Sequence, residues 1–552
     1  MIRSAINRNI QKLSRNKPNA SPKIVPIKLG LPKIISSSKG GTSNLNPREA
    51  LIDANIKQSV KDIPTPQAHL DVPNGLLSKL NIDNVDFIYP ITLIHKDKPY
   101  ILLQFSGSIY TTFGEIKSIH PLTGLPTTSV YLLSCDTNGV DSYIDGGTFL
   151  WCYDGIRENY QYAEMSFMST GDLMVLSSYT GNVTFIQNTL HFEYITINHF
   201  NEGNYFVARF NLNTELGFIG DLSWVLPIIA FGDQNIEMVL DNDDYAYLSG
   251  TYQNKFKIGF IDGSSLTSNL INDMFIVKIK HNADIAWLRT TDKTSVDDTE
   301  GSTGSIRSES ITLNFSDSNS GGEPRLTIVG QFNSKFKYNN FVLDSQAISF
   351  NMWVAQFNLN GDMQWLISPE SDLNNQPDDY VDVYEIIYDS VHQGNLFIAG
   401  VLKGEFKFNT NVGATDDVIF IAELSVNGTW VNYNYIRTEL PKSELDWYPH
   451  LTFGDSLYVS FFGWGDVYFN NPSGTIVPGN GIINLWVNKL TDNIWGDSPE
   501  HISGNVTNPS KNICYNDETR SVIIIGTYIV TFTNTNGYLR QFLGSFDIPK
   551  EQ

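Results

Sequence analysis

The sequence has few cysteines and no long apolar run. Its 552 residues include only three cysteines, Cys135, Cys152 and Cys514. Three thiols are too few for a disulfide framework, and their spacing suits no zinc site. We expect reduced, buried thiols, although Cys135 and Cys152 could pair across neighbouring strands. No stretch approaches eighteen consecutive apolar residues, so no membrane-spanning helix is expected.

Positive charge is scarce except near the start of the sequence. The chain has 37 Lys and Arg against 59 Asp and Glu, a formal net charge of −22. Residues 1–50 hold ten of the basic side chains and a single acid, Glu49, which leaves a net charge of −31 on the rest. Such a body repels nucleic acid and anionic lipid, whereas the basic segment attracts polyanions and acidic protein surfaces.

The basic segment 1–45 is predicted to be a flexible, mostly disordered arm. Its first residues place an apolar stripe opposite a basic one, and Pro18 ends the pattern. A helix of this kind could lie on an anionic membrane, serve as a presequence or dock on a partner. Residues 46–81 are predicted to form a short helix and a linker. Because no apolar core of seven residues follows the basic ones, an ordinary secretory signal is not expected.

From about residue 82 the chain consists of short strands separated by Gly, Asn and Asp turns. Three phrases recur in a fixed order. The first is a strand through a small residue, as in "YLSGTYQNKFKIG" (247–259), "TIVGQFNSKFKYN" (327–339) and "FIAGVLKGEFKFN" (397–409). The second is another strand, such as "MFIVKIKHN" (274–282) or "MWVAQFNLN" (352–360). The third is a polar turn that leads to Trp. The glycine is expected to permit a sharp turn or a close approach between strands.

Each unit therefore predicts a four-stranded antiparallel meander, which must stack on its neighbours to bury both faces. Six tryptophans are expected at equivalent positions in the last strands, packed between units: Trp151, Trp224, Trp287, Trp365, Trp430 and Trp495. The fold prediction is an all-β protein, a seven-bladed β-propeller over 82–550. Its blades are predicted at about 82–155, 156–226, 227–290, 291–368, 369–433, 434–497 and 498–550. The last blade lacks a Trp strand, and the chain just before the first unit could supply one.

The order of the three phrases resembles the SBBP-type β-propeller repeat, found on bacterial surface proteins and in proteins of large DNA viruses. The resemblance covers about 470 residues and is clearest in the third and fourth units. It implies a repeat scaffold without a common activity, so no catalytic residue is carried over from the family. Together with the Asn-rich composition and the missing secretory signal, it favours a virion component of a large DNA virus.

No complete catalytic or ligand motif is present. The nine histidines show no metal spacing, and neither a nucleophile elbow nor a phosphate-binding glycine loop occurs. Only "SVNGTW" (425–430) approaches a sialidase Asp-box, and "NLNGDMQW" only loosely resembles a quinoprotein blade end. The acid clusters at 136–145, 241–244 and 378–385 could hold calcium but match no twelve-residue calcium loop, and are expected to be solvated turns.

We therefore assign no catalytic, cofactor-binding or metal-ligating residue and no cofactor, and we expect no enzyme activity. The favoured function is a non-catalytic structural or protein-interaction propeller, tethered through its basic arm. Its faces would bind protein partners, and the arm would bind a polyanion or an acidic surface. The alternative is an enzyme or glycan-binding protein with its site in the central channel, where acids, Arg or His would have to converge.

Overall fold

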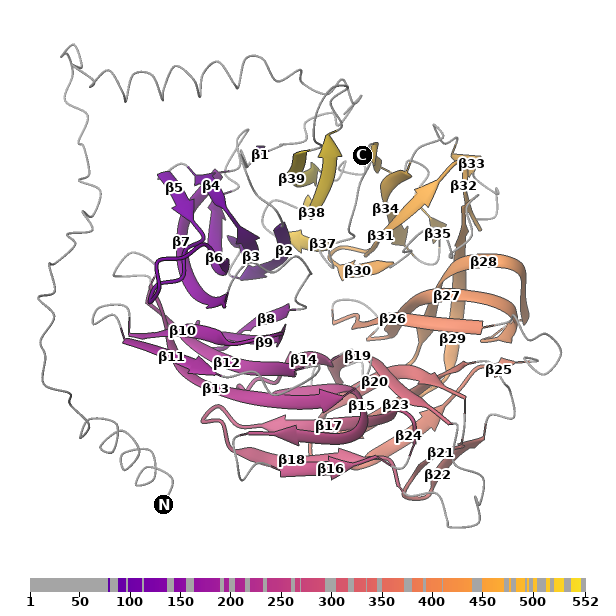
Figure 1. Cartoon of the computed structure of the whole chain (residues 1–552). Helices are drawn as coiled ribbons and strands as arrows, with labels where there is room; N and C mark the ends of the chain where they lie inside the picture. The colour runs from indigo at the N-terminus through magenta and orange to yellow at the C-terminus, as the bar shows by residue number, and fades with distance from the viewer. Residues whose placement is uncertain are drawn as a thin grey trace, which may run out of the picture. The chain divides into compact units, whose positions relative to one another are not determined.

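The computed structural model describes the backbone of residues 78–79 and, with gaps, of 88–547, and side chains between 93 and 495. The chain divides into Met1–Thr65 and Pro66–Gln552, and every described residue lies in the second part. The described residues contain strands and no helix, which confirms the all-β prediction (Figure 1). The helices predicted near residues 1–17 and 46–60, and the basic arm itself, lie outside the described residues.

The strands follow one another as antiparallel four-stranded meanders, numbered here in chain order. Meander 1 has β2 (Ile88–His95), β3 (Lys98–Ser106), β6 (Thr128–Asp136) and β7 (Tyr143–Tyr153). Meander 2 has β8 (Ala163–Phe167), β9 (Leu173–Tyr179), β12 (Asn204–Asn213) and β13 (Ile219–Phe231). Meander 3 has β14 (Ile236–Leu240), β15 (Ala246–Ile258), β17 (Asp273–Ile279) and β18 (Ile285–Thr290). Meander 4 has β19 (Ile306–Phe315), β20 (Pro324–Phe332), β23 (Asn351–Asn358) and β24 (Met363–Ile367).

The later meanders repeat the pattern. Meander 5 has β26 (Tyr380–Tyr388), β27 (Leu396–Lys407), β28 (Asn411–Leu424) and β29 (Trp430–Arg437). Meander 6 has β30 (His450–Phe453), β31 (Leu457–Trp464), β34 (Ile483–Thr491) and β35 (Ile494–Trp495), and β36 (Glu500–Ser503) also pairs with β34. Meander 7 has β37 (Ile513–Asn516), β38 (Ser521–Val530) and β39 (Tyr538–Asp547).

A strand from ahead of meander 1 completes meander 7. The short β1 (Ser78–Lys79) pairs antiparallel with β39, so that Ser78 lies opposite Leu543 and Lys79 opposite Phe542. The resulting order, β1-β39-β38-β37, is again four-stranded. The expectation that the chain before the first unit supplies the missing strand is met by this pairing.

Shorter strands extend the meanders or link them. One group pairs with the last strand of the meander before it: β10 (Val183–Asn188) with β7, and β32 (Val467–Phe469) with β29. The end of β15 pairs with β13 in the same way. The remaining short strands are β4 (Ser108–Thr111), β5 (Gly114–Lys117), β11 (Glu193–Ile197), β16 (Ser264–Thr267), β21 (Lys335–Tyr338), β22 (Phe341–Asp344), β25 (Glu370–Ser371) and β33 (Ile476–Val477).

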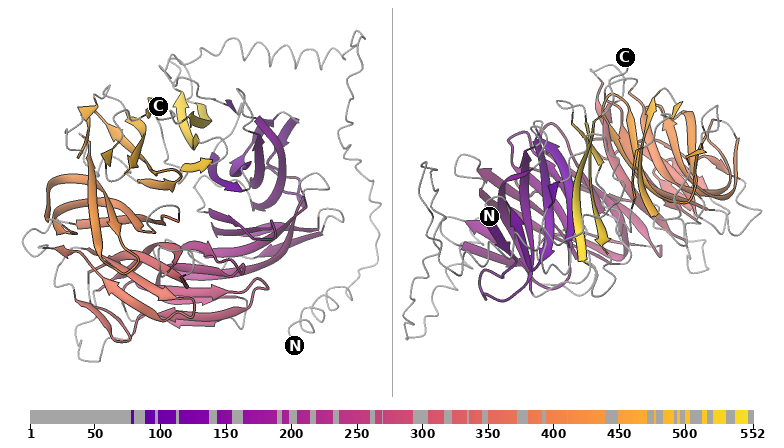
Figure 2. Two further views of the ribbon diagram at one scale, coloured as in Figure 1. Left: turned by 180° about the vertical axis from the view of Figure 1, so that it is seen from behind. Right: turned by 90° about the horizontal axis from the view of Figure 1, so that it is seen from above.

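The hydrophobic core lies between consecutive meanders. Successive clusters join meander 1 to 2, 2 to 3, 3 to 4, 4 to 5 and 5 to 6. The sheets therefore stack face against face, as Figure 2 shows. The first strands also contact one another in order, β2 with β8, then β14, β19, β26, β30 and β37, and β37 contacts β2. An isolated meander could not bury both faces, so this stacking supplies most of the apolar burial.

The repeated glycine lies inside a strand and not at a turn. β15 is continuous through Gly250, which lies opposite Ile236 on one side and Phe275 on the other. A Cβ at Gly330 would come within 1.9 Å of the Arg307 carbonyl oxygen, and one at Gly400 within 2.2 Å of the Asp382 carbonyl oxygen. The first strands β19 and β26 bulge at these points. The glycine therefore permits a close approach of backbones, which is one of the two roles expected of it.

The six tryptophans do not share one position, so that expectation was wrong. Trp224, Trp287 and Trp365 do: each lies opposite the third-strand residue that precedes a bulge. In meander 5 this position holds Asn432, and Trp430 comes two residues earlier. Trp495 occupies the register of Trp430, and Trp151 lies deeper in its strand, opposite Val130. The turns of meanders 4 and 5 are equally long, at 358–362 and 425–429, but Trp430 directly follows its turn whereas Trp365 comes two residues later, so the two rings differ in register.

Candidate functional site

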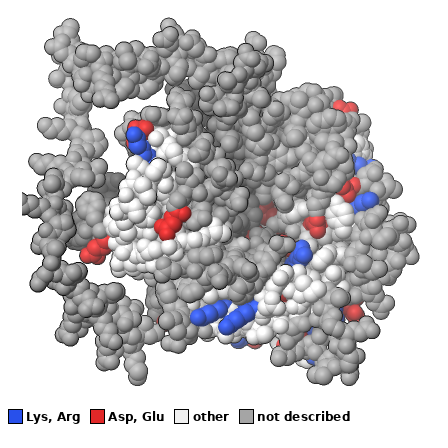
Figure 3. All heavy atoms as spheres, in the orientation of Figure 1, with Lys and Arg blue, Asp and Glu red and all other residues white. Residues whose placement is uncertain are grey.

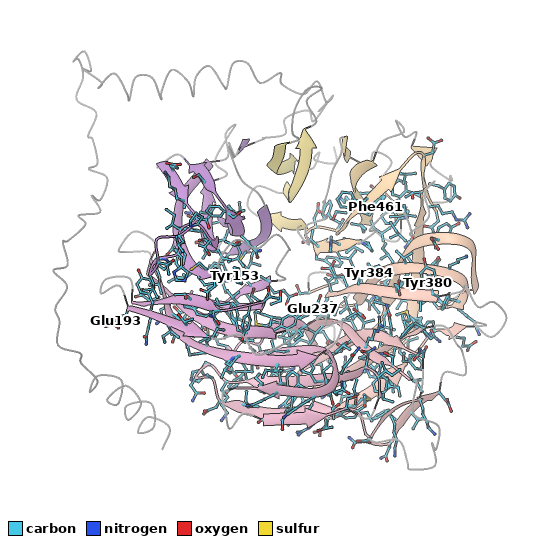
Figure 4. All side chains as sticks on the ribbon, in the orientation of Figure 1. Tyr153, Glu193, Glu237, Tyr380, Tyr384 and Phe461 are labelled. Atoms are coloured by element: carbon cyan, nitrogen blue, oxygen red, sulfur yellow. The ribbon has the colours of Figure 1, made fainter. Side chains whose placement is uncertain are left out.

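A row of polar side chains links the first strands of successive meanders. The Glu164 carboxylate on β8 accepts a hydrogen bond from the Met238 amide on β14, at 2.6 Å. One meander later, Glu237 accepts from the Ile311 amide at 3.3 Å. Figure 4 labels Glu237, on the first strand of its meander. These residues are 74 positions apart in each pair, so the contact repeats with the unit.

The row continues through meanders 4 and 5. The Ser310 hydroxyl accepts from the Ile386 amide at 3.2 Å, and Glu385 accepts from the Leu451 amide at 2.7 Å. His450 Nδ1 lies 3.5 Å from the same Glu385 oxygen. Acids and a histidine therefore do gather on neighbouring first strands, as the channel alternative requires. Each carboxylate already binds the next backbone, however, so the geometry assigns them to joining the sheets.

Sequence reasoning missed most of this row. Glu385 belongs to the acid cluster at 378–385, but Glu164 and Glu237 were not singled out. The available signal is a short one: an acid followed by an apolar residue inside the first strands β8, β14 and β26, as in "AEMSF" and "IEMVL". Two-residue patterns of this kind occur everywhere in β proteins, and only the stacking of sheets gives them a common partner.

A second series of polar contacts lies where the third strand meets the hairpin turn between strands one and two. Arg209 on β12 is 2.5 Å from the Asp172 carboxylate and also donates to the His281 carbonyl of meander 3, at 3.2 Å. In meander 6, Lys489 lies 3.6 Å from Asp455. Each ion pair links the turn between strands one and two to the third strand of the same meander, and Arg209 also bonds to the next meander.

The member of this series in meander 3 is the most enclosed. Lys278 Nζ lies 4.3 Å from the centre of the Tyr245 ring and 4.9 Å from that of Tyr247, with an Asp241 oxygen at 4.0 Å. Burial lowers the Lys278 pKa, while Asp241 and Asp243 act in the opposite direction. Burial also raises the Tyr247 pKa, as does its hydrogen bond to Asp241. The ammonium is held by cation–π contacts and one carboxylate.

Buried groups with raised pKa values are placed out of reach of a substrate. Burial raises the pKa of Asp273 to about 6 against hydrogen bonds from Thr291 and Met274, and the residue is 1% exposed. Burial and nearby Asp154 raise the pKa of the free, buried Cys152 thiol to about 12, which disfavours the thiolate at neutral pH. Cys152 lies opposite Ser129 and Cys135 opposite Ile144, so the two cysteines are not cross-strand neighbours.

The acid cluster at 241–244 forms a turn, but Asp241 and Asp244 are buried in it, so the expected solvated turn is not what the structure shows. The described part of the cluster at 378–385 lies in strand β26 and not in a turn. Asp241 accepts hydrogen bonds from the amides of Asp243 and Tyr245, and Asp244 accepts from the Ser169 amide and hydroxyl of meander 2. Across the described ranges, no group of three or more His, Cys, Asp or Glu is arranged to hold a metal ion. On the face in Figure 3, the described charged side chains are dispersed among uncharged ones.

The two most exposed large apolar side chains among the described residues, Leu122 and Leu125, lie on one hairpin. Residues 118–127 connect β5 to β6, and within them Ile119, Leu122 and Leu125 are 43%, 59% and 64% exposed. The hairpin is nevertheless internally bonded: the His120 amide donates to the Leu125 carbonyl at 2.9 Å, and the Gly124 amide to the His120 carbonyl at 2.8 Å. We call residues 118–127 the apolar hairpin.

The buried side chain of His120 binds the backbone of the apolar hairpin. The Leu122 amide donates to His120 Nδ1 at 3.2 Å, which leaves Nε2 as the protonated nitrogen of the neutral ring. Nε2 faces the Asp154 carboxylate at 3.3 Å and the Thr184 hydroxyl at 3.4 Å. The exposed leucines are therefore presented on a preorganised turn.

Comparison with known proteins gives little. No protein-family model and no curated protein matches the chain. Among solved structures, it is similar to the Bacillus licheniformis rhamnogalacturonan lyase PL11, with 8% identity and a TM-score of 0.29 over 85% of this chain and 90% of that one. It is also similar to the exotype rhamnogalacturonan lyase YesX, with 9% identity and a TM-score of 0.23 over 80% and 92% of the two chains.

These structures correct one expectation. Both similar proteins are enzymes, so the prediction that this chain is not an enzyme is withdrawn. At TM-scores of 0.29 and 0.23 the likeness assigns no reaction and no residue role to this chain. Among the described residues, no helix is long and apolar enough to cross a membrane.

Proposed function

We propose that the described strands form a seven-bladed β-propeller that serves as a scaffold for a protein partner. Three observations support the architecture. The sheets are four-stranded meanders with cores between neighbours, the first strands contact one another from β2 through to β37 and back to β2, and β1 joins the last sheet. Such an arrangement leaves the loops on two faces for recognition.

The apolar hairpin carries the proposal of a protein partner. Leu122 and Leu125 are more than half exposed, although the backbone beneath them is held by hydrogen bonds. Ordered apolar side chains in water favour association, because they bury apolar surface at little entropic cost. The neighbouring Lys117 and Glu115 pair with each other at 3.2 Å, so the tip offers apolar contacts and no net charge.

The test is comparative purification from the organism that encodes the chain. Wild type, the double variant Leu122→Asp/Leu125→Asp and the control Val342→Asp are purified under the same conditions, and bound proteins are quantified by mass spectrometry. Val342 is 47% exposed on β22, away from the hairpin in sequence. We expect one or more partners to be retained by wild type and the control and lost by the double variant, at equal Tm. An identical set of bound proteins for all three contradicts the proposal.

The basic arm and the location of the protein stay proposals. The positive charge of the arm suits a tether to a polyanion or an acidic surface, and salt would weaken each phosphate contact. The resemblance to the SBBP-type repeat motivates a place in the particle of a large DNA virus. Mass spectrometry of purified particles checks that placement directly.

A further inference from the structure

The polar position on the third strand has a recurring partner of opposite charge. Arg209, Lys278 and Lys489 occupy it in meanders 2, 3 and 6, opposite Met174, Tyr247 and Tyr458 of the second strands. Each of these cations lies within 4.0 Å of an acid in the adjoining turn. The rule in these meanders is a turn acid neutralised by a cation on the third strand.

Meander 5 breaks this rule. The same position holds Glu423, opposite Phe397 and next to the bulge in β28. The adjoining turn contains Asp389, whose amide donates to the Asn395 carbonyl at 2.9 Å. Both carboxylates are buried, with Glu423 5% and Asp389 3% exposed. An acid therefore stands where meanders 2, 3 and 6 carry a cation, beside a turn that keeps its own acid.

One oxygen of Glu423 has no partner. Oε1 accepts a hydrogen bond from Asn395 Nδ2 at 2.6 Å, whereas Oε2 is buried and has no hydrogen-bond partner among the described residues. Both oxygens belong to one carboxylate, so Oε2 also lies beside the turn that contains Asn395. Burying an ionised carboxylate with one oxygen unpaired is unfavourable unless a cation compensates the charge.

We propose that Glu423 and Asp389 bind a hard metal cation, with Ca²⁺ as the probe, in the place that a side-chain cation takes in meanders 2, 3 and 6. Carboxylate and carbonyl oxygens are the ligands that such ions prefer, and water completes the shell. The proposed site has only two carboxylates. It is therefore smaller than the groups of three or more His, Cys, Asp or Glu that are absent from the described ranges. It is independent of the proposed partner binding, because it concerns a buried position and not the apolar hairpin.

The experiment measures Tm of the full-length protein after chelation and then at increasing CaCl₂, with KCl matching the ionic strength. The variants are Glu423→Lys, Glu423→Gln and the control Glu193→Gln, which removes an exposed glutamate on β11 (Figure 4). We expect a saturable rise in Tm for wild type and the control, since a ligand that binds only the folded state stabilises it. E423K is expected to be insensitive to CaCl₂, because its ammonium takes the cation position, and E423Q to lose Ca²⁺ affinity on the order of tenfold or more.

Two results overturn the proposal. One is a wild-type Tm that is the same in chelator and in CaCl₂, which would mean that the folded protein binds no Ca²⁺. The other is an equal response of wild type and E423Q. Should both Glu423 variants fail to fold, equilibrium dialysis of ⁴⁵Ca²⁺ against wild type and Asp389→Asn decides. Equal binding by the two proteins, or no binding by either, counts against the site.

Discussion

The Trp365 indole lies against Gly428 in the turn of the next meander. A Cβ at Gly428 would be 3.1 Å from the indole ring, and Trp365 Nε1 donates to the Val426 carbonyl of the same turn at 3.1 Å. Trp287 repeats the arrangement one meander earlier: its Nε1 donates to the Leu359 carbonyl at 3.1 Å, and a Cβ at Gly361 would be 3.3 Å from its ring. A Trp after a polar turn therefore links one sheet to the turn of the next meander, through a hydrogen bond and a ring contact.

Replacing Trp365 by Phe should remove that hydrogen bond and keep most of the ring contact. We expect a loss of about 1 kcal/mol in the free energy of unfolding, and of about 3 kcal/mol for Trp365→Ala. Trp430→Phe is the control, since no hydrogen bond from its indole occurs in the described part and its ring packs on Phe408 at 4.9 Å. Urea unfolding followed by fluorescence measures both. Equal losses for the two Phe variants would contradict the role of the Trp365 hydrogen bond.

Alanine at Gly330 should be far more damaging than alanine at Gly220. The added methyl would lie 1.9 Å from the Arg307 carbonyl oxygen in the first case, but 3.0 Å from a Leu150 side-chain carbon in the second. Backbone cannot move aside as a side chain can, so G330A is expected to cost more than about 4 kcal/mol. The yield of soluble protein and Tm report the difference. A G330A protein as stable as G220A would contradict the close approach.

The Asp273 carboxyl should make stability depend on pH. Its folded pKa of about 6 lies above the model-compound value of 3.8, so the folded state binds the proton more tightly. Stability relative to Asp273→Asn is therefore largest below about pH 4, falls as pH rises to about 6, and is constant above. The full change is about 3 kcal/mol for a shift of two units.

Chemical unfolding of wild type and D273N between pH 4 and 7 checks this window. Asp284→Asn removes the same charge from an exposed turn and serves as the control. A constant difference between wild type and D273N over the whole range would show that burial does not perturb this carboxyl.

The row of polar side chains that links the first strands should contribute to the stacking of sheets. Glu164→Ala removes the acceptor of the Met238 amide, and leaving that amide unpaired is expected to cost about 1–3 kcal/mol. Glu164→Gln keeps an oxygen acceptor and should cost less than half as much. Tm of the three proteins at pH 7 is the measurement, and equal losses for Ala and Gln would point to charge and not to the hydrogen bond.

The β1 strand should stabilise the protein by pairing with β39, which is far from it in sequence. A chain that starts at Pro66 retains β1, and one that starts at Asn81 lacks it and exposes the paired stretch around Phe542 and Leu543. We expect the shorter protein to show a lower Tm and a greater tendency to aggregate, because a free strand edge promotes association. Equal Tm and solubility for both chains would mean that the pairing contributes nothing.

The order of strands could be predicted from the sequence because each unit carries its own local instructions. Alternating apolar residues define the strands, and Gly, Asn and Asp define turns such as that at Gly361, with its φ of 83°. The all-β class of the described residues follows from these local patterns. Even the need for a strand from before the first unit follows from counting strands within the last one.

Contacts between units depend on tertiary structure, and here sequence reasoning failed in part. Trp365 and Trp430 end similar phrases, yet Trp430 directly follows its turn and Trp365 comes two residues later, so they lie in different registers. The carboxylates of Glu164 and Glu237 find their partners 74 residues away, and Glu423 is recognisable as an exception only after Lys278 has been superposed on it by strand register. Local periodicity determines which residues face the next sheet, but which atoms meet there depends on how two sheets stack, and that is decided only when the chain is folded.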